Sequence, residues 1–273
     1  MWRSLVALCV MFVVIIGNGH SQQAAGPCLE VPESLWISNP AAAGERVAGY
    51  IKRLSTVKEP ALSTCVNKLL EKAYADSTTR LYLSDELEAL LFNTASPLRN
   101  DSLYMVFLKA TLASRLVPEA EKSRYRFQLE NVRKNMPGSK AVDFELLDKK
   151  GGRFKMSDIK SDYLVLFFYD PDCVRCQKTE QRLMADSLLK MPGVKVLAVY
   201  PGIRTSEWLD APSFLPDSWT DGCSPQGEVN NRLLYFIQSM PSIYLLDKDK
   251  RVILKDVSAH RLHDYLSNIC YQN

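Results

Sequence analysis

Residues 163–176 decide the fold, and they read YLVLFFYDPDCVRC. The first part, Tyr163 to Tyr169, is a continuous apolar run of strand length, which is typical of a strand buried on both faces. Asp170-Pro171-Asp172 then turns the chain, and a helical pattern of apolar residues begins at the cysteine pair. The segment therefore predicts a buried strand, a tight turn and a helix that begins near Cys173.

The two cysteines in this segment have the spacing of a redox pair. Cys173 and Cys176 are separated by two residues, which brings both sulfurs onto one helical turn. The free N–H groups and dipole of the helix N-terminus favour a thiolate on Cys173, the attacking species. Cys176 would then resolve the mixed disulfide. Arg175 would favour the thiolate further, whereas the neighbouring Asp170 and Asp172 would oppose it.

A zinc site and a purely structural disulfide are the alternatives to redox chemistry. Zinc takes four ligands at set spacings. After residue 21 the chain has no second Cys-x-x-Cys and only two histidines, His260 and His263, far from the pair. A disulfide across so short a loop is strained and reducible rather than stabilising. We therefore expect a redox-active disulfide between Cys173 and Cys176 and no metal.

The chain around this segment changes its hydrophobic period once. Residues 41–135 carry apolar residues at helical spacing, with Ser84 as the expected cap of one helix and Pro118 as the expected first residue of another. Met136-Pro137-Gly138-Ser139 breaks that pattern. Residues 136–273 then predict an α/β layer domain. Its expected strands are 141–147, 154–156, 163–169, 194–199, 243–246 and 252–254, and its expected helices are 173–190, 228–237 and 260–269.

The N-terminus has the pattern of a secretory signal. Arg3 precedes an apolar run from Leu5 to Ile16, and the small residues Gly19 and Ser21 follow. We predict a signal peptide over residues 1–21 that is cleaved near Ser21, and an aperiodic segment over 22–40. An uncleaved anchor and a buried strand are the alternatives. The prediction places the protein outside the cytoplasm, in the periplasm or cell envelope.

Composition limits the number of domains and the class of partner. The 273 residues are 47% hydrophobic, which suits one or two domains with a substantial core. The formal net charge is only +3, so no strong field points to nucleic acid as a partner.

Pro241 is a second candidate for the site. It begins the predicted strand in Met240-Pro241-Ser242-Ile243-Tyr244, well downstream of the cysteine pair. A proline is tolerated at the start of a strand, which is the simpler interpretation. A cis proline that holds backbone groups beside the sulfurs is the functional one.

Four segments, in this order, carry a resemblance to a known family: PGSKAVDFELLDKKGG (137–152), YLVLFFYDPDCVRC (163–176), VKVLAVY (194–200) and MPSIYLLDKDKRVILKD (240–256). With them, residues 137–268 resemble the thioredoxin superfamily, and within it the secreted TlpA/ResA-like thiol–disulfide oxidoreductases. The resemblance implies a central mixed β-sheet flanked by helices. It also implies an exposed Cys173 at one sheet edge, a cis Pro241 beside it, and neither metal nor organic cofactor. Residues 41–135 resemble helical domains of unknown role found upstream of thioredoxin modules.

The sequence departs from the family pattern at four places. Asp172 stands where Trp is common, and Phe167 stands where thioredoxin has a buried carboxylate. Thr179 stands where the TlpA/ResA-like branch often has Glu, and Glu180 follows it. Glu180 is therefore a candidate acid–base group, with a solvated helix face as the alternative. Met240 replaces a common Thr before the proline, at a position that tunes redox behaviour.

Four further cysteines follow the predicted signal. Cys65 is either a buried free thiol or the partner of Cys28. In the implied fold, Cys223 follows a strand that ends at the active site, whereas Cys270 ends a helix that runs away from it. A bridge needs Cα atoms within about 7 Å, so we predict none between these two and place Cys223 near the redox site.

These expectations combine into one hypothesis and two alternatives. The chain is expected to exchange disulfides in cysteine-containing exported proteins, as a reductase or isomerase, with electrons from an upstream membrane or periplasmic donor. The first alternative is an envelope protein-binding module with a vestigial or regulatory redox pair. The second is a thiol peroxidase. A peroxidatic cysteine normally sits in a Thr-x-x-Cys setting, which Asp170 to Cys173 lacks.

Overall fold

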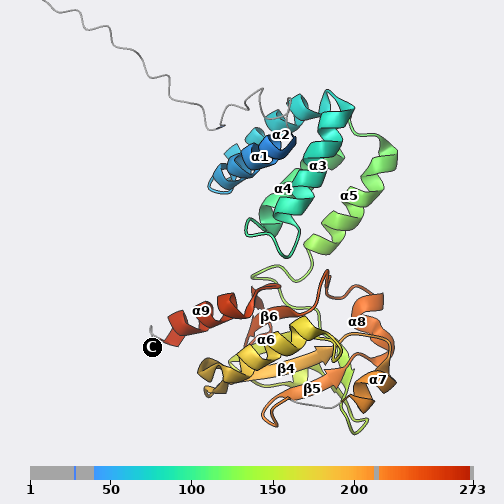
Figure 1. Cartoon of the computed structure of the whole chain (residues 1–273), viewed down its shortest axis with the longest axis vertical. Coiled ribbons are helices and arrows are strands. Elements are labelled where there is room, and N and C mark those ends of the chain that lie inside the picture. Colours follow the sequence, from blue (N-terminus) through green and yellow to red (C-terminus); the bar gives the residue numbers. More distant parts are fainter. Residues whose placement is uncertain (1–27, 29–39, 212–214, 271–273) are drawn as a thin grey trace, which may run out of the picture.

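A computed structural model describes residue 28 and residues 40–211 and 215–270. Figure 1 shows two parts, a helical part drawn in blue to green and a sheet with helices on its faces drawn in yellow to red. The predicted signal peptide with its cleavage near Ser21 lies outside the described residues, as does nearly all of the 22–40 segment.

The helical part consists of five helices around one apolar core. Leu69 and Phe107 are among its fully buried side chains. None of the helices in the described part of the chain is long and apolar enough to cross a membrane. The helices are α1 (Pro40–Leu54), α2 (Ala61–Tyr74), α3 (Ser77–Leu91), α4 (Asp101–Ala113) and α5 (Glu119–Val132).

Two of the predicted helix starts are wrong. The cap of α3 is Asp76, whose carboxylate accepts the Thr79 N–H at 2.7 Å, so Ser84 lies inside the helix and is buried. Pro118 is the N-cap residue of α5, with an extended backbone, so the first helical residue is Glu119. Because α3 already begins at Ser77, the N–H groups that follow Ser84 are bonded within the helix and need no cap.

The second part is a seven-stranded mixed sheet with the order β2-β1-β5-β4-β3-β6-β7. The central strand β3 pairs in parallel with β4 and antiparallel with β6. This arrangement confirms the predicted mixed sheet flanked by helices. The strands are β1 (Glu145–Leu147), β2 (Arg153–Lys155), β3 (Tyr163–Phe168), β4 (Val194–Tyr200), β5 (Thr220–Cys223), β6 (Ser242–Asp247) and β7 (Val252–Leu254), and the helices are α6 (Val174–Ala185), α7 (Thr205–Asp210), α8 (Glu228–Asn231) and α9 (Ala259–Cys270).

Strand β3 is buried on both faces, as its apolar run predicted. Leu164, Leu166 and Phe168 enter one apolar core. Val165 and Phe167 point to the other side and enter a second core, which also contains Cys176. All five side chains have an exposed fraction of 0%. The ladders to β4 and β6 fix the register of this strand, so it delivers the chain to Asp170 in one place.

The predicted helix over 228–237 is wrong beyond Asn231, where α8 ends. The carbonyls of the next residues are bound from the linker between the two parts. Lys134 Nζ donates to Leu233 O at 2.9 Å, and Asn135 Nδ2 donates to Leu234 O at 2.9 Å. Because these tertiary bonds hold the backbone in turns, the segment approaches Pro241 without regular structure.

A disulfide joins Cys28 to Cys65 on α2, with the Cα atoms 4.9 Å apart. The structure thus decides between the two alternatives for Cys65. Cys65 itself is fully buried in the helical core, and Cys28 packs against that core. The bridge closes a loop of sequence separation 37 and fastens Cys28 to the helical part.

We predict that Cys28→Ser lowers the free energy of unfolding of the helical part by about 2–4 kcal/mol, because the unfolded chain regains the entropy that the closed loop removed. Denaturant unfolding followed by circular dichroism measures the change. Cys270→Ser is the matched control, since Cys270 is a free thiol. Equal stability of the Cys28 variant and the control would contradict the prediction.

Candidate active site

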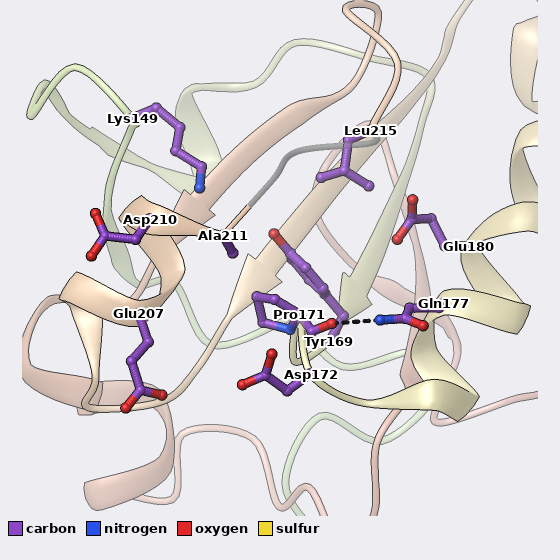
Figure 2. A pocket seen from close by; sticks show the side chains of 10 residues that line it. All are labelled: Lys149, Tyr169, Pro171, Asp172, Gln177, Glu180, Glu207, Asp210, Ala211 and Leu215. Carbon is purple, nitrogen blue, oxygen red and sulfur yellow. Dashed lines mark hydrogen bonds between the residues drawn. The ribbon is translucent and has the colours of Figure 1, made fainter.

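The turn that follows β3 fixes the first cysteine. Cys173 N–H donates to Asp170 O at 3.1 Å, and Asp172 N–H donates to the Asp170 carboxylate at 2.9 Å. Gln177 Nε2 donates to Pro171 O at 2.9 Å, the dashed line in Figure 2. These bonds join the turn to the first turns of α6.

Cys173 is the N-cap residue of α6. Its Sγ accepts the backbone N–H of Cys176 at 3.2 Å, in the way that a serine or aspartate oxygen caps other helices. The Cys173 side chain is half-buried, whereas Cys176 is 1% exposed. Burial, with a contribution from the hydrogen bond to Cys173, raises the pKa of the Cys176 thiol to about 12. The pair therefore has a half-buried outer cysteine and a buried, protonated inner thiol.

Met240 and Pro241 lie near the cysteine pair, at the edge of the sheet where β3 ends and β6 begins. Ser242, the first residue of β6, pairs with Phe168, the last residue of β3. The preceding Met240–Pro241 peptide bond is cis. Met240 O lies 3.9 Å from Cys173 Sγ, within hydrogen-bonding reach of sulfur. The register of β3 with β6 thus brings Met240 beside Cys173 although they are distant in sequence.

Glu180 lies one turn beyond Cys176 on α6 and is 8% exposed, so it does not belong to a solvated helix face. Burial is the main cause that raises the pKa of its carboxyl, and the nearby Asp221 carboxylate adds to the rise. A carboxyl with a raised pKa on the same helix face as Cys176 is a candidate for proton transfer with that thiol.

Asp221 on β5 is a site residue that sequence reasoning missed. Tyr169 OH donates to Asp221 Oδ1 at 2.9 Å, and Trp208 Nε1 donates to Tyr169 OH at 3.1 Å. Burial raises the pKa of Asp221, and the bond from Tyr169 opposes that rise. Its other oxygen, Oδ2, has no hydrogen-bond partner among the described residues. A second buried carboxyl therefore lies close enough to Glu180 to affect its ionisation.

Glu180 lines a cavity of about 510 Å³ beside the cysteine turn (Figure 2). Asp172, Glu180, Glu207 and Asp210 contribute the carboxylates. Lys149 is the cation in the lining, and its Nζ lies 4.1 Å from the centre of the Trp208 ring. Within the described residues, no group of three or more His, Cys, Asp or Glu side chains is placed to hold a metal ion.

The remaining candidates, Arg175 and Cys223, differ in their exposure. Arg175 is exposed on the first turn of α6. Cys223 is fully buried at the end of β5, in the same apolar core as Cys176, and burial raises its thiol pKa. Cys223 and Cys270 are both free thiols, which confirms that no bridge joins them.

Comparison with family models divides the chain at the same place as the hydrophobic period does. Residues 29–135 match a domain family of unknown function, DUF5106, and residues 137–254 match the AhpC/TSA family. A search of curated proteins found no match.

Several solved structures are similar. A thioredoxin-like protein from Bacteroides caccae is 27% identical over 86% of this chain and 87% of its own, with a TM-score of 0.80. A conserved protein of unknown function from Bacteroides fragilis is 40% identical over 48% of this chain and 98% of its own, with a TM-score of 0.46. The thioredoxin domain of a thiol-disulfide oxidoreductase from Bacteroides vulgatus is 22% identical over 49% and 97%, with a TM-score of 0.44. The first match extends over both parts of the chain.

The raised pKa of Glu180 predicts a pH-dependent effect on stability. A carboxyl whose folded-state pKa exceeds its unfolded-state value makes the protein less stable as pH rises between the two values. Glu180→Gln removes this titration. We therefore expect the variant to be more stable than the wild type at pH 7–8 and to lose most of that advantage at pH 4, where most folded and unfolded wild-type molecules hold the proton. Denaturant unfolding at the two pH values measures the difference, and an advantage that does not change with pH would contradict the assignment.

Proposed function

We propose that this protein, whose residues 137–254 form a thioredoxin-like domain of the AhpC/TSA family, is a thiol–disulfide oxidoreductase that acts on exported polypeptides through Cys173 and Cys176. The observation that carries the proposal is the position of Cys173 Sγ. It belongs to a half-buried side chain, it receives the Cys176 N–H at the start of α6, and it lies beside the Met240 carbonyl.

The two cysteines supply both the electrons and the protons that reduction of a client disulfide needs. Cys173 thiolate attacks one sulfur of a client disulfide, which forms a mixed disulfide and releases a client thiolate. Cys176 thiolate then attacks Cys173 Sγ, forms the Cys173–Cys176 disulfide and releases the second client sulfur. Two electrons pass to the client, and the two cysteine protons end on the client thiols. An upstream dithiol donor in the membrane or periplasm reduces the pair again.

Resolution needs a proton acceptor, because the Cys176 thiol has a pKa of about 12. Glu180 is the buried carboxyl that follows it on α6. In its ionised form it accepts the Cys176 proton, and its raised pKa makes it a stronger base than an ordinary carboxylate. Asp221 supports this role, because its charge contributes to that rise.

A polypeptide client is favoured by the placement of the proline segment. The main-chain carbonyl of Met240 faces the space beside Cys173 Sγ. A main chain that carries a disulfide can lie along this backbone while its sulfur reaches Cys173. Release of the client by Cys176 makes the protein a reductase, and rearrangement before release makes it an isomerase.

A trapping experiment tests the cysteine assignment. We expect Cys176→Ser to accumulate mixed disulfides through Cys173, because the resolving sulfur is gone. In the insulin reduction assay with dithiothreitol, Cys173→Ser should fall to the dithiothreitol background. The Cys173→Ser, Cys176→Ser double variant is the control. Partners retained equally by the double variant would support a binding module instead, and rapid peroxide consumption by the wild type would support a peroxidase.

Glu180 is tested by the lifetime of the mixed disulfide. We expect Glu180→Gln to slow resolution by about 10–100-fold at pH 7, with a deficit that narrows as pH rises and hydroxide takes over deprotonation of Cys176. Stopped-flow decay of a preformed mixed disulfide measures the rate. Glu207→Gln is the matched control, since Glu207 lines the same cavity but pairs with Arg204 at the surface. Equal rates for both variants would remove Glu180 from the mechanism.

A further inference from the structure

We propose that the helical domain is a working part of the redox site. Its α3–α4 connection, residues 92–100, holds the proline segment, residues 236–242, and thereby sets the rate of exchange with polypeptide disulfides. Figure 1 shows this connection at the end of the helical part that faces the sheet. The effect on the rate of disulfide exchange rests on the function proposed above, whereas the positioning of the proline segment does not.

Three residues before the proline contact the helical connection. Phe236 stacks on Phe92 with ring centroids 5.7 Å apart and an interplanar angle of 9°. Gln238 Nε2 donates to Phe92 O at 3.1 Å. The hydroxyls of Ser239 and Thr94 are hydrogen-bonded at 2.9 Å. The contacts are both apolar and polar, and the last of them is one residue from Met240.

The residue after the proline is linked to the helical side through Asp256, a residue of the sheet domain. Ser242 Oγ donates to Asp256 Oδ1 at 2.6 Å, and Arg99 Nη1 donates to Asp256 Oδ2 at 2.5 Å. Arg99 also binds Asp101 at 3.2 Å, and Asp101 binds Lys255 at 2.7 Å. The four charged side chains are only 6–15% exposed, and together they form an alternating cluster across the two domains. Buried charges of this kind tolerate little displacement, because separating one pair leaves a charge uncompensated.

The proline segment depends on these contacts because it lacks regular structure of its own. Residues 232–241 contain no helix or strand. Backbone hydrogen bonds hold residues 233–237 locally, and the residues nearest the proline are positioned by side-chain contacts, several of them with the helical domain. The segment ends at Met240, whose carbonyl lies 3.9 Å from Cys173 Sγ. A shift at Ser239 would move this carbonyl relative to the sulfur.

A polypeptide disulfide and a small alkylating reagent should respond differently to a shift of Met240 relative to Cys173. A polypeptide that reaches Cys173 must pass along Met240, so its reaction depends on where the segment lies. Iodoacetamide is small and needs only the accessible Sγ. The helical domain is therefore expected to affect exchange with polypeptides far more than alkylation of Cys173.

Removing the Thr94–Ser239 hydrogen bond tests the inference with little change in shape. Thr94→Val keeps the branched side chain and Ser239→Ala removes the other hydroxyl. Thr56→Val is the matched control, because the exposed Thr56 hydroxyl donates to the local Arg53 carbonyl at 2.8 Å and lies away from the proline segment. We expect each test variant to lower kcat/KM for insulin reduction by about 5–10-fold, and the double variant to be no worse than either single one, because both break the same bond. Alkylation of Cys173 should change less than twofold.

Hydrogen exchange provides a readout that does not need activity. We expect amides of residues 236–242 to exchange faster in Thr94→Val than in the wild type or the control, with β3 unchanged. Unchanged exchange in this segment would overturn the positioning. Faster exchange with unaltered insulin kinetics, or an equal loss in alkylation, would overturn the link to polypeptide exchange. An inactive wild type would instead overturn the proposed function, and the exchange data would still decide the positioning.

Discussion

The first helix after the central strand begins on a sulfur atom, and the site is built around that constraint. A helix N-terminus needs acceptors for its free N–H groups, and here Cys173 Sγ accepts the Cys176 N–H. The atom that caps the helix is thus the atom proposed to attack. Whatever fixes the start of α6 also fixes the reactive sulfur. Strand β3 and the Asp170 turn do this from one side, and the proline segment does it from the other.

Two acidic side chains near the cysteine pair are energetically unfavourable in these packed surroundings when they are ionised. Glu180 and Asp221 are held in surroundings that disfavour their charged forms, and each carries a raised pKa. An apolar or amide side chain would fit a buried position with less desolvation. The free energy that their ionisation costs at neutral pH is consistent with a role in proton transfer, since groups with such shifts concentrate at functional sites.

Strong local patterns made much of this structure predictable. The apolar run of β3 and the cysteine spacing of α6 determine local structure by themselves, so both were found from sequence. Residues 232–237 were misassigned because Lys134 and Asn135, nearly a hundred residues away, bind their carbonyls. Asp221 was missed because a single acid in a four-residue strand leaves no periodic signal, and its importance comes only from Tyr169 and Glu180 across the sheet.

The Cys28–Cys65 bridge gives the chain two dithiols with opposite requirements. In the proposed reaction the Cys173–Cys176 pair alternates between reduced and oxidised forms, whereas the bridge on α2 must survive encounters with the same reductant. Cys65 is completely enclosed in the helical core, where an incoming thiolate cannot align with its sulfur. Burial therefore closes the Cys65 side of the bond to attack, and the half-buried Cys28 sulfur is the route by which a reductant can reach the bridge that fastens this part of the scaffold.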